Sequence, residues 1–378
     1  MSNRWLATYH LTGDEKVARA KAKDICVEQT VEFPIDLIPK DSYIFREIVG
    51  RVESFGPAPD GKGFIATISF DERITGGELP QFLNAVFGNI SIKPGIRLIG
   101  LKPTEGMLKS FGGPRFGRDG LRRALNAYDR PILCAIVKPM GLSSDELADM
   151  AYRFALGGID IVKDDHSLAN QPFSEFEERV EKCTAAVAKA NRESGHNAIY
   201  MPSLIAPAGE IEKRARFAKE AGAGGFLVAP GIIGFDMMRF LADSIGLPLL
   251  AHASFLGSFV TSQSSGIAPS VLFGTLMRLA GADAANFPNY AGRFSFSKKE
   301  CGAIARADEE PMGQIKPIFP APGGGVTLSS LPEMHRFYGD DVLFLIGSDL
   351  YRIGPDLVEN ARRYREMAEK IEPAKQSP

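Results

Sequence analysis

The sequence predicts a two-domain α/β protein. An N-terminal α+β (ferredoxin-like) domain, residues 1–125, precedes a C-terminal (β/α)₈ TIM barrel with a final helix, residues 126–378. In the C-terminal part, short apolar runs alternate with stretches of helical periodicity eight times, which is the strand count of such a barrel. The length of 378 residues also exceeds what one hydrophobic core normally serves.

The N-terminal region mixes strand-like and helix-like segments, a pattern typical of an antiparallel sheet with helices on one face. Strands are predicted at 5–11, 44–53, 63–70 and 96–101, and helices at 15–26 and 78–87. A stretch rich in glycine and arginine, residues 111–118, indicates the connection to the next domain.

The barrel strands are predicted from eight apolar runs. These are residues 132–137, 159–162, 198–202, 225–229, 248–252, 282–286, 316–320 and 342–346. The first connecting helix has a capping-box start, Ser143 with Glu146, and ends at Gly157 and Gly158. No Gly-x-Gly-x-x-Gly motif follows the first strand, so an open dinucleotide-binding sheet is disfavoured and no nucleotide cofactor is expected.

The composition is that of an ordinary soluble protein, with 44% hydrophobic and 24% charged residues and a net charge of −2. This balance leaves no basic stripe for nucleic acid and no polybasic patch for a membrane surface. The apolar runs are too short to span a bilayer, and the first residues lack a signal-peptide core. The 4 cysteines are scattered without a CxxC spacing, which favours a reducing cytoplasm over a disulfide framework or zinc site.

Catalytic and binding residues are expected at the carboxyl ends of the barrel strands, where the active sites of this fold lie. The polar residues and glycines at these ends are Lys138, Lys163, Asp164, Asp165, His166, His252, Asn286, Gly323, Gly324, Gly325, Gly347 and Ser348.

The glycines after the seventh and eighth strands are the clearest chemical signal. Barrels commonly hold a phosphate at these two loops, and backbone without a Cβ can approach an oxyanion closely. A Pro-Gly-Gly-Gly sequence is also compatible with a simple tight turn. Its position beside Gly347 and Ser348 favours a phosphate site formed by Gly323, Gly324 and Gly325 with that second loop.

The polar end of the second strand is the next signal, because alternation places Lys163 and Asp165 on the same side. A lysine there can form an ion pair or Schiff base, act as a base, or bind a hard metal after carbamylation. A structural ion pair is the most common of these. Lys138 could likewise bind a phosphate or form a salt bridge. His252 is compatible with a structural role, as a buried histidine whose ring nitrogens are hydrogen-bonded within the core.

The motifs around these residues resemble the RuBisCO large-subunit superfamily. They are residues 136–143, 157–165 and 170–173, with further likeness at 7–12, 87–89, 323–325, 337–341 and 347–348. The resemblance covers nearly the whole chain in the correct order. It implies an α+β domain before a barrel, and a head-to-tail homodimer in which the N-terminal domain of one subunit completes the other's site.

The resemblance also implies roles for individual residues. Glu28 and Asn89 become the partner's contribution to the site, and Lys138 becomes the lysine that handles enolisation protons. Lys163 and Asp165 occupy metal-ligand positions, and the glycine loops cradle a phosphate.

Four departures from the family pattern argue against carboxylation. His166 replaces a glutamate, which weakens a Mg²⁺ site because this ion prefers oxygen ligands, so bound Mg²⁺ is doubtful. Ala253 replaces the arginine that grips a second phosphate, and Asn286 stands where the carboxylase has a histidine. Residues 289–294 replace the loop carrying the carboxylation lysine, and only Arg293 stands near that lysine's position.

The resemblance therefore implies a RuBisCO-like protein of the non-carboxylating form IV branch. It would be an isomerase acting on a small phosphorylated ketose such as 5-methylthioribulose 1-phosphate, in methionine (sulfur) salvage. One alternative is a diketo-phosphate enolase, although Asn89 and His166 depart from the residues expected of it. The others are a sugar-acid phosphate decarboxylase and a phosphate-binding regulatory protein that has lost catalysis. Lys138, Lys163 and His166 all remain open as the general base.

Overall fold

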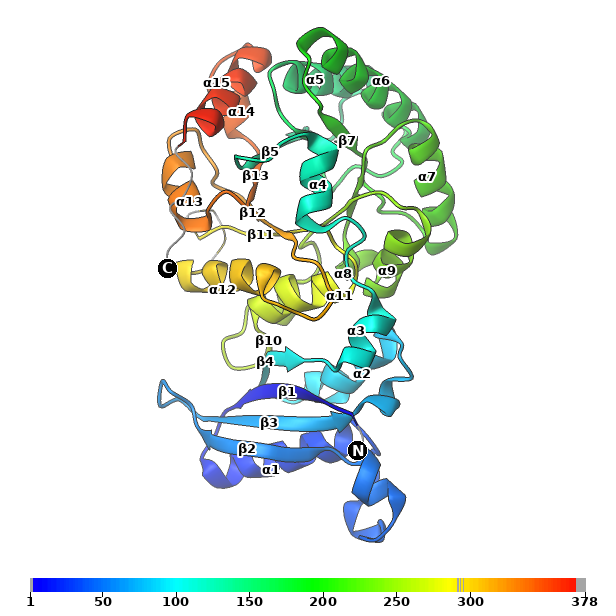
Figure 1. Cartoon of the computed structure of the whole chain (residues 1–378), viewed down its shortest axis with the longest axis vertical. Coiled ribbons are helices and arrows are strands. Elements are labelled where there is room, and N and C mark those ends of the chain that lie inside the picture. The colour runs from blue at the N-terminus through cyan, green and yellow to red at the C-terminus, as the bar shows by residue number, and fades with distance from the viewer. Residues whose placement is uncertain (1–2, 291, 293, 295, 372–378) are drawn as a thin grey trace.

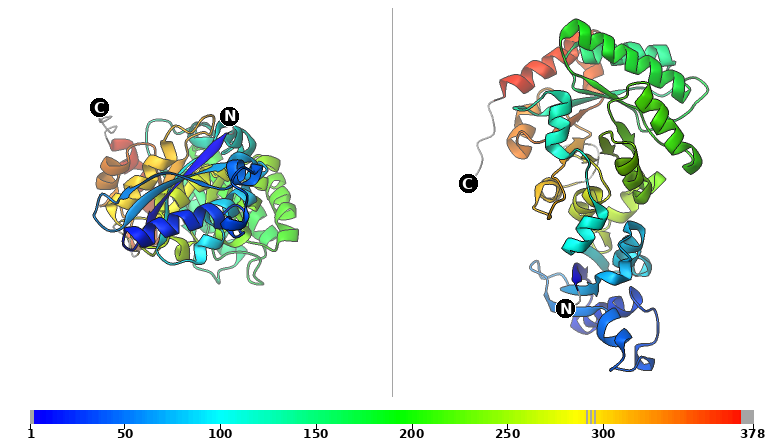
Figure 2. Two further views of the ribbon diagram at one scale, coloured as in Figure 1. Left: turned by 90° about the horizontal axis from the view of Figure 1, so that it is seen from below. Right: turned by 45° about the vertical axis from the view of Figure 1, so that its right-hand side comes forward.

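The computed structural model describes residues 3–290, 292, 294 and 296–371. Two regions are visible, with the N-terminal sheet below and the barrel above (Figure 1). Figure 2 shows the same regions at opposite ends of the long axis of the molecule. This arrangement confirms the predicted fold class.

The N-terminal sheet has the strand order β10-β4-β1-β3-β2. Its strands are β1 (Arg4–Leu11), β2 (Arg51–Pro57), β3 (Phe64–Asp71), β4 (Ile96–Lys102) and β10 (Gly266–Ile267). The first four are antiparallel, in the 4-1-3-2 order of a ferredoxin-like fold, whereas β10 comes from the barrel region and pairs with β4 in parallel. Alternate residues of β1 are buried, so one face of the sheet packs against the core.

One predicted N-terminal strand begins later than expected. Residues 44–53 were expected to be extended, but η2 (Ile44–Ile48) is a helical turn and β2 starts at Arg51. The Ser42 hydroxyl accepts a hydrogen bond from the Phe45 backbone N–H at 3.2 Å, which favours a turn over a strand. Gly50 then packs against Cys26, where an added Cβ would lie 2.9 Å from the Cys26 Cα.

The barrel contains all eight predicted strands. They are β5 (Ile132–Val137), β6 (Ile161–Asp164), β7 (Ile199–Met201), β8 (Phe226–Val228), β9 (Leu249–Ala251), β11 (Ala284–Pro288), β12 (Phe319–Gly323) and β13 (Leu343–Ile346). The paired strands follow the order β7-β6-β5-β13-β12-β11-β9-β8. A parallel bridge between Ser203 and Leu227 joins the two ends of this sheet and closes the barrel.

Helices connect the strands and cover the outside of the barrel. The α-helices of the molecule are α1 (Glu15–Glu28), α2 (Leu79–Phe87), α3 (Glu105–Phe111), α4 (Gly117–Leu125), α5 (Ser144–Leu156), α6 (Phe176–Ser194), α7 (Ala208–Glu220), α8 (Pro230–Ile233), α9 (Phe235–Ser244), α10 (Gly257–Val260), α11 (Met277–Leu279), α12 (Lys298–Glu309), α13 (Leu331–Tyr338), α14 (Asp349–Arg352) and α15 (Leu357–Lys370). Short 3₁₀ or π turns are η1 (Ile35–Leu37), η3 (Glu72–Thr75), η4 (Asn89–Ile92) and η5 (Ser270–Leu276). The predicted capping box at Ser143 and Glu146 is confirmed at the start of α5.

Inward-facing side chains of the strands fill the barrel and form one buried cluster with α4. Leu121 and Leu125 of α4 belong to this cluster, together with Ile132 and Leu343 at the beginnings of β5 and β13. Helix α4 therefore packs at the amino-terminal end of the barrel, opposite the expected site. The division of the chain at residue 125 remains a prediction.

Three strands lie further along the chain than predicted. β11 spans 284–288 instead of 282–286, so Asn286 belongs to the strand. β6 spans 161–164 instead of 159–162, so Lys163 belongs to the strand itself. β12 spans 319–323 instead of 316–320, and it pairs with β13 only at Gly323. Pro320 and Pro322 lack the N–H groups that a fuller ladder requires, which explains the short pairing.

Two general features bear on the environment of the protein. Within the part of the chain that the structure describes, no helix is both long and apolar enough to cross a membrane. All four cysteines are buried as free thiols.

Candidate active site

Lys163 lies inside the barrel at the end of β6. Its side chain is among the largest fully buried ones, with 2% of the residue exposed, and its ammonium group donates to the Asp164 carbonyl at 3.0 Å. Burial lowers the pKa of Lys163, because removing water disfavours the charged form. Proton loss from this amine is therefore easier than from a free lysine, as a base or nucleophile requires.

Asp164 points to the side of β6 opposite Lys163, where its hydrogen bonds to neighbouring elements hold the end of the strand. Its carboxylate pairs with Arg179 at 3.1 Å, and both side chains have 0% exposure. The hydroxyl of Tyr200 and the backbone N–H of Ser203 donate to the same carboxylate, at 2.5 and 3.1 Å. The ion pair at this strand end thus belongs to Asp164, while the neighbouring Lys163 forms none among the described residues.

Asp165 and His166 follow β6 at the barrel mouth. The His166 Nδ1 lies 3.2 Å from the Asp165 Oδ1, and the backbone and hydroxyl groups of Ser167 donate to the same oxygen at 3.0 and 2.8 Å. Burial acts to raise the pKa of Asp165, but the hydrogen bonds from His166 and Ser167 outweigh it and hold that pKa well below its usual value. Asp165 is therefore an ionised carboxylate that orients His166.

His252 stacks on His166, with ring centroids 4.5 Å apart and planes inclined by 12°. Its Nδ1 lies 2.8 Å from the Ser254 hydroxyl. Burial, followed by the charges of Lys163 and His166, lowers the pKa of His252 well below the ordinary value, so the ring is neutral at neutral pH. The structure places His252 at the mouth beside these site residues, whereas the sequence was also compatible with an inert core histidine.

Lys138 follows β5 and faces the loop after β13. An added Cβ on Gly347 would lie 3.4 Å from the Lys138 Nζ, so the ammonium group sits against this glycine. The Tyr351 hydroxyl donates to the Ile136 carbonyl at 2.7 Å and ties α14 to the end of β5. Lys138 has no ion pair or hydrogen bond to the described side chains, which leaves its amino group available to a ligand.

The two glycine loops lie next to each other in the mouth. The Asp349 carboxylate, after β13, accepts the Leu328 N–H from the loop after β12 at 3.0 Å and so links them. Gly324 and Gly325 have φ values of 81° and 93°, which favour glycine, and Ser348 is exposed.

The side chain of Asn286 supports the first of these loops. Its amide donates to the Ala321 carbonyl at 3.0 Å, and an added Cβ on Gly323 would lie 2.7 Å from the Asn286 Nδ2. Asn286 therefore positions β12, and Gly323 is required for this close packing. Arg293 lies outside the described residues.

Glu28 and Asn89 lie together in the N-terminal region. Asn89 donates to one Glu28 oxygen at 3.2 Å, and Lys93 donates to the other at 2.7 Å. Both hydrogen bonds lower the pKa of Glu28, that from Lys93 being the stronger influence. Buried Gln29 fixes this arrangement, because its amide bonds the backbone on both sides of the loop at Asn84, Ala85 and Ile90.

This N-terminal pair is separate from the barrel mouth within one chain. Glu28 ends α1, and Figure 1 shows α1 below the sheet, on the side away from the barrel. The structure thus brings Lys138, Lys163, Asp165, His166 and His252 to one mouth, but it does not bring Glu28 and Asn89 there.

The donor set at the β6 end does not fit Mg²⁺ in its present chemical form. Mg²⁺ requires near-octahedral oxygen coordination, whereas Lys163 offers an amine and His166 an imidazole. Asp164 is sequestered by Arg179, which leaves Asp165 as the carboxylate facing the mouth. No group of three potential ligands from His, Cys, Asp and Glu is found in the described ranges.

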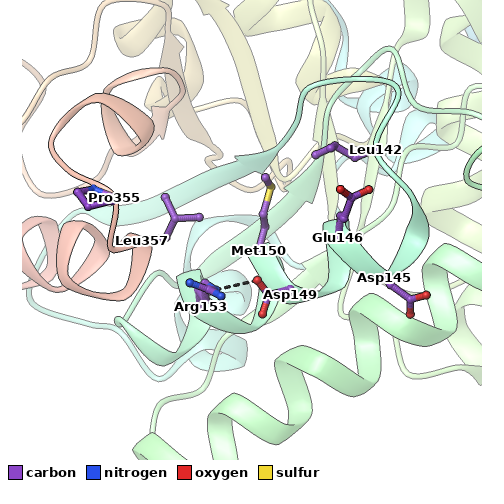
Figure 3. A pocket seen from close by; sticks show the side chains of 8 residues that line it. All are labelled: Leu142, Asp145, Glu146, Asp149, Met150, Arg153, Pro355 and Leu357. Atoms are coloured by element: carbon purple, nitrogen blue, oxygen red, sulfur yellow. Dashed lines mark hydrogen bonds and ion pairs between the residues drawn. The ribbon is translucent and has the colours of Figure 1, made fainter.

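A separate hollow of about 490 Å³ lies on the outside of the barrel. Figure 3 shows it between α5 and the start of α15, with Arg153 paired to Asp149 at 2.7 Å. It contains none of the predicted site residues, and the charged side chains of its walls are three carboxylates and one arginine, a balance that would repel a phosphate. The barrel mouth is therefore the better candidate for the active site.

Comparison with known proteins agrees with this geometry. Residues 118–352 match the family model of the ribulose bisphosphate carboxylase large chain, catalytic domain. The chain belongs to the RuBisCO large-chain family. Within that family its relatives include RuBisCO-like proteins, and its fold matches that of a solved member.

Three of these relatives are informative. The chain is 37% identical over 366 residues to 5-methylthioribulose-1-phosphate isomerase of Rhodospirillum rubrum, covering 96% of each protein. It is 31% identical to 2,3-diketo-5-methylthiopentyl-1-phosphate enolase of Bacillus pumilus, covering 97% of this chain and 92% of that one. The crystal structure of a Rubisco-like protein from Rhodopseudomonas palustris superposes with a TM-score of 0.89 at 35% identity, covering 99% and 100% of the two chains.

Proposed function

We propose that this RuBisCO-like protein is a sugar-phosphate isomerase, acting on a phosphorylated ketose of the 5-methylthioribulose 1-phosphate type without fixing carbon dioxide. The observation that carries the proposal is the close approach of Lys138 and Gly347, which follow the neighbouring strands β5 and β13 at the barrel mouth. It places an available amino group directly beside a loop suited to one phosphate.

The site residues divide into a phosphate cradle and a set of proton carriers. Gly324, Gly325, Gly347 and Ser348 present backbone and hydroxyl donors to the phosphate. Lys138 removes the proton next to the substrate carbonyl, which gives an enediolate. A second group, Lys163 or His166, returns a proton to the neighbouring carbon, so no atom is gained or lost.

The enolase reaction named for the relative from Bacillus pumilus starts with the same proton abstraction. The isomerase is favoured because the isomerase relative is more similar, at 37% against 31% identity, with nearly complete coverage in both cases. Asn89 and His166, which differ from the pattern expected of the enolase, support the same choice.

The test is product analysis by ¹H and ³¹P NMR. We expect the protein to convert 5-methylthioribulose 1-phosphate into an isomeric phosphoester, while ribulose 1,5-bisphosphate with labelled bicarbonate gives no carboxylated product. Conversion of only a diketo-pentyl phosphate would favour the enolase. Phosphate-ligand binding without turnover of any substrate would favour a regulatory protein, and release of carbon dioxide from a sugar-acid phosphate would favour a decarboxylase.

We propose that turnover does not depend on Mg²⁺, because His166 and the sequestered Asp164 leave too few oxygen ligands. Protein dialysed against EDTA should keep most of its isomerase activity, and added Mg²⁺ should change kcat less than about twofold. Metal content by mass spectrometry of the same samples provides the control. Stoichiometric Mg²⁺ together with a carbamylated Lys163 would contradict this prediction.

We propose a homodimer in which Glu28 and Asn89 of one subunit complete the barrel mouth of the other. Glu28 ends α1, which lies on the side of the N-terminal sheet away from the barrel, and this separation from its own mouth supports the proposal (Figure 1). Asn89 is bonded to Glu28 and so belongs to the same location. A Glu28→Ala protein and a Lys138→Ala protein should each be nearly inactive. When the two proteins are coexpressed and pair at random, about half of the dimers are mixed, and each mixed dimer has one intact site out of two. About a quarter of wild-type activity should therefore return.

The matched control for the dimer experiment is Glu15→Ala, at an exposed pair with Arg19 on the same helix. It should leave activity unchanged. If Glu28→Ala is fully active, or if the mixture stays as inactive as its components, the shared site is wrong.

A further inference from the structure

The loop after β9 carries an exposed aromatic side chain on a strained backbone. Phe255 is 80% exposed, and its φ of 68° lies in the left-handed region. The Leu256 N–H bonds the Ala253 carbonyl at 3.2 Å, so Phe255 occupies the third position of a tight turn. Glycine normally takes this position, because the left-handed conformation brings the Cβ of any other residue too close to the backbone.

Packing around the turn fixes the backbone of Phe255 just after the end of β9, at the carboxyl-terminal side of the barrel. An added Cβ on Gly231 would lie 2.6 Å from the Ser254 carbonyl oxygen, so the turn rests directly on the neighbouring loop. Leu256 is 1% exposed and anchors the other side of the turn. The Ser254 hydroxyl lies 2.8 Å from the Nδ1 of His252 in the mouth. Strained residues of this kind concentrate at functional sites, which motivates a function for the ring.

We propose that Phe255 determines specificity by contacting the apolar end of the substrate, an alkylthio-substituted ketose 1-phosphate. This proposal rests on the proposed function. β9 lies two strand positions from β12 in the barrel, about 10 Å at the usual spacing between strands. An extended five-carbon sugar with its phosphate on the glycine loops spans such a distance.

The chemistry of the β9 side suits an apolar group. The segment from His252 to Phe255 contains no lysine, arginine or carboxylate, Ala253 is small, and the Phe255 side chain is exposed. A second phosphate would find no charge on this segment, whereas a methylthio group would bury apolar surface against the ring.

The test compares 5-methylthioribulose 1-phosphate with ribulose 1-phosphate, which has a hydroxyl in place of the methylthio group. Calorimetry in a Lys138→Ala background measures binding without turnover, and kcat/KM is measured with Lys138 intact. Adding Phe255→Ala should lower the preference for the methylthio compound about tenfold in both measurements, the scale of a small apolar contact. Phe255→Leu should keep most of the preference, and Phe240→Ala, a half-exposed phenylalanine on α9, should keep all of it.

A second variant, Phe255→Gly, separates the ring from its backbone. It should lose the preference like the alanine variant and yet unfold at a higher denaturant concentration, because glycine accepts the positive φ. If the Phe255 variants instead lose affinity and kcat/KM equally for both sugars, and also self-associate more weakly in sedimentation, then a second copy of the chain covers the ring. That result would overturn the proposal. Tenfold discrimination in binding by a protein that turns over neither sugar would refute the isomerase and support the role of Phe255.

Discussion

Replacing Lys138 with alanine is expected to lower kcat about a thousandfold, within the range of about 10²–10⁴ that a positioned general base contributes. The amino group beside Gly347 is the one that we propose to remove the substrate proton. Because the phosphate cradle is mainly backbone, KM should change only a few-fold. Steady-state isomerisation of 5-methylthioribulose 1-phosphate measures both constants.

Lys138→Arg distinguishes a base from a phosphate ligand. Arginine keeps the positive charge for a phosphate but does not give up its proton at neutral pH. We therefore expect Lys138→Arg to be as impaired in kcat as the alanine variant. The matched control is Lys189→Ala, on the outer surface of α6, which should be fully active. A loss confined to KM, with kcat restored by arginine, would make Lys138 a phosphate ligand and contradict the proposed role.

The second large effect is on stability. Asp164→Ala leaves the charge of Arg179 buried without its partner and removes the acceptor of Tyr200 and of the Ser203 N–H. Breaking a buried ion pair in this way costs about 3–5 kcal/mol in the free energy of unfolding. Guanidinium denaturation followed by near-ultraviolet circular dichroism should show a clearly lower midpoint.

The control for this stability prediction is Asp149→Ala, which removes an exposed ion pair with Arg153 on α5. Pairs of this kind contribute about 0–1 kcal/mol, so the midpoint should barely move. Similar midpoints for the Asp164→Ala and Asp149→Ala proteins would mean that the buried pair does not hold the end of β6, contrary to the structure.

Much of the fold was predictable from sequence because each barrel strand is a short apolar run between turn residues. The errors occurred where a contact distant in sequence sets the boundary. The strand predicted at 44–53 starts late because Gly50 packs against Cys26 and a helical turn precedes it. The seventh barrel strand starts late because the N–H of Phe319 bonds the carbonyl of Asp283, at the start of the neighbouring strand.

The candidate site was predictable in its residues more than in its arrangement. Alternation along the second strand correctly separates Lys163 and Asp165 from Asp164. It does not reveal that Arg179 and Tyr200, from two other elements, take Asp164 out of the mouth. The stacking of His166 on His252 likewise joins two loops that are distant in sequence, so no local pattern predicts it. Nothing in the local sequence marks Gln29, whose amide shapes the region around Glu28 through hydrogen bonds to a distant loop.

The central claim is that this mouth abstracts a proton next to the carbonyl of a singly phosphorylated ketose. Solvent deuterium exchange into 5-methylthioribulose 1-phosphate, followed by ¹H NMR in D₂O, tests it most directly. We predict that wild-type protein incorporates deuterium at the carbon next to the carbonyl, and that Lys138→Ala abolishes this incorporation. An absence of exchange with wild-type protein, or undiminished exchange with Lys138→Ala, would contradict the account.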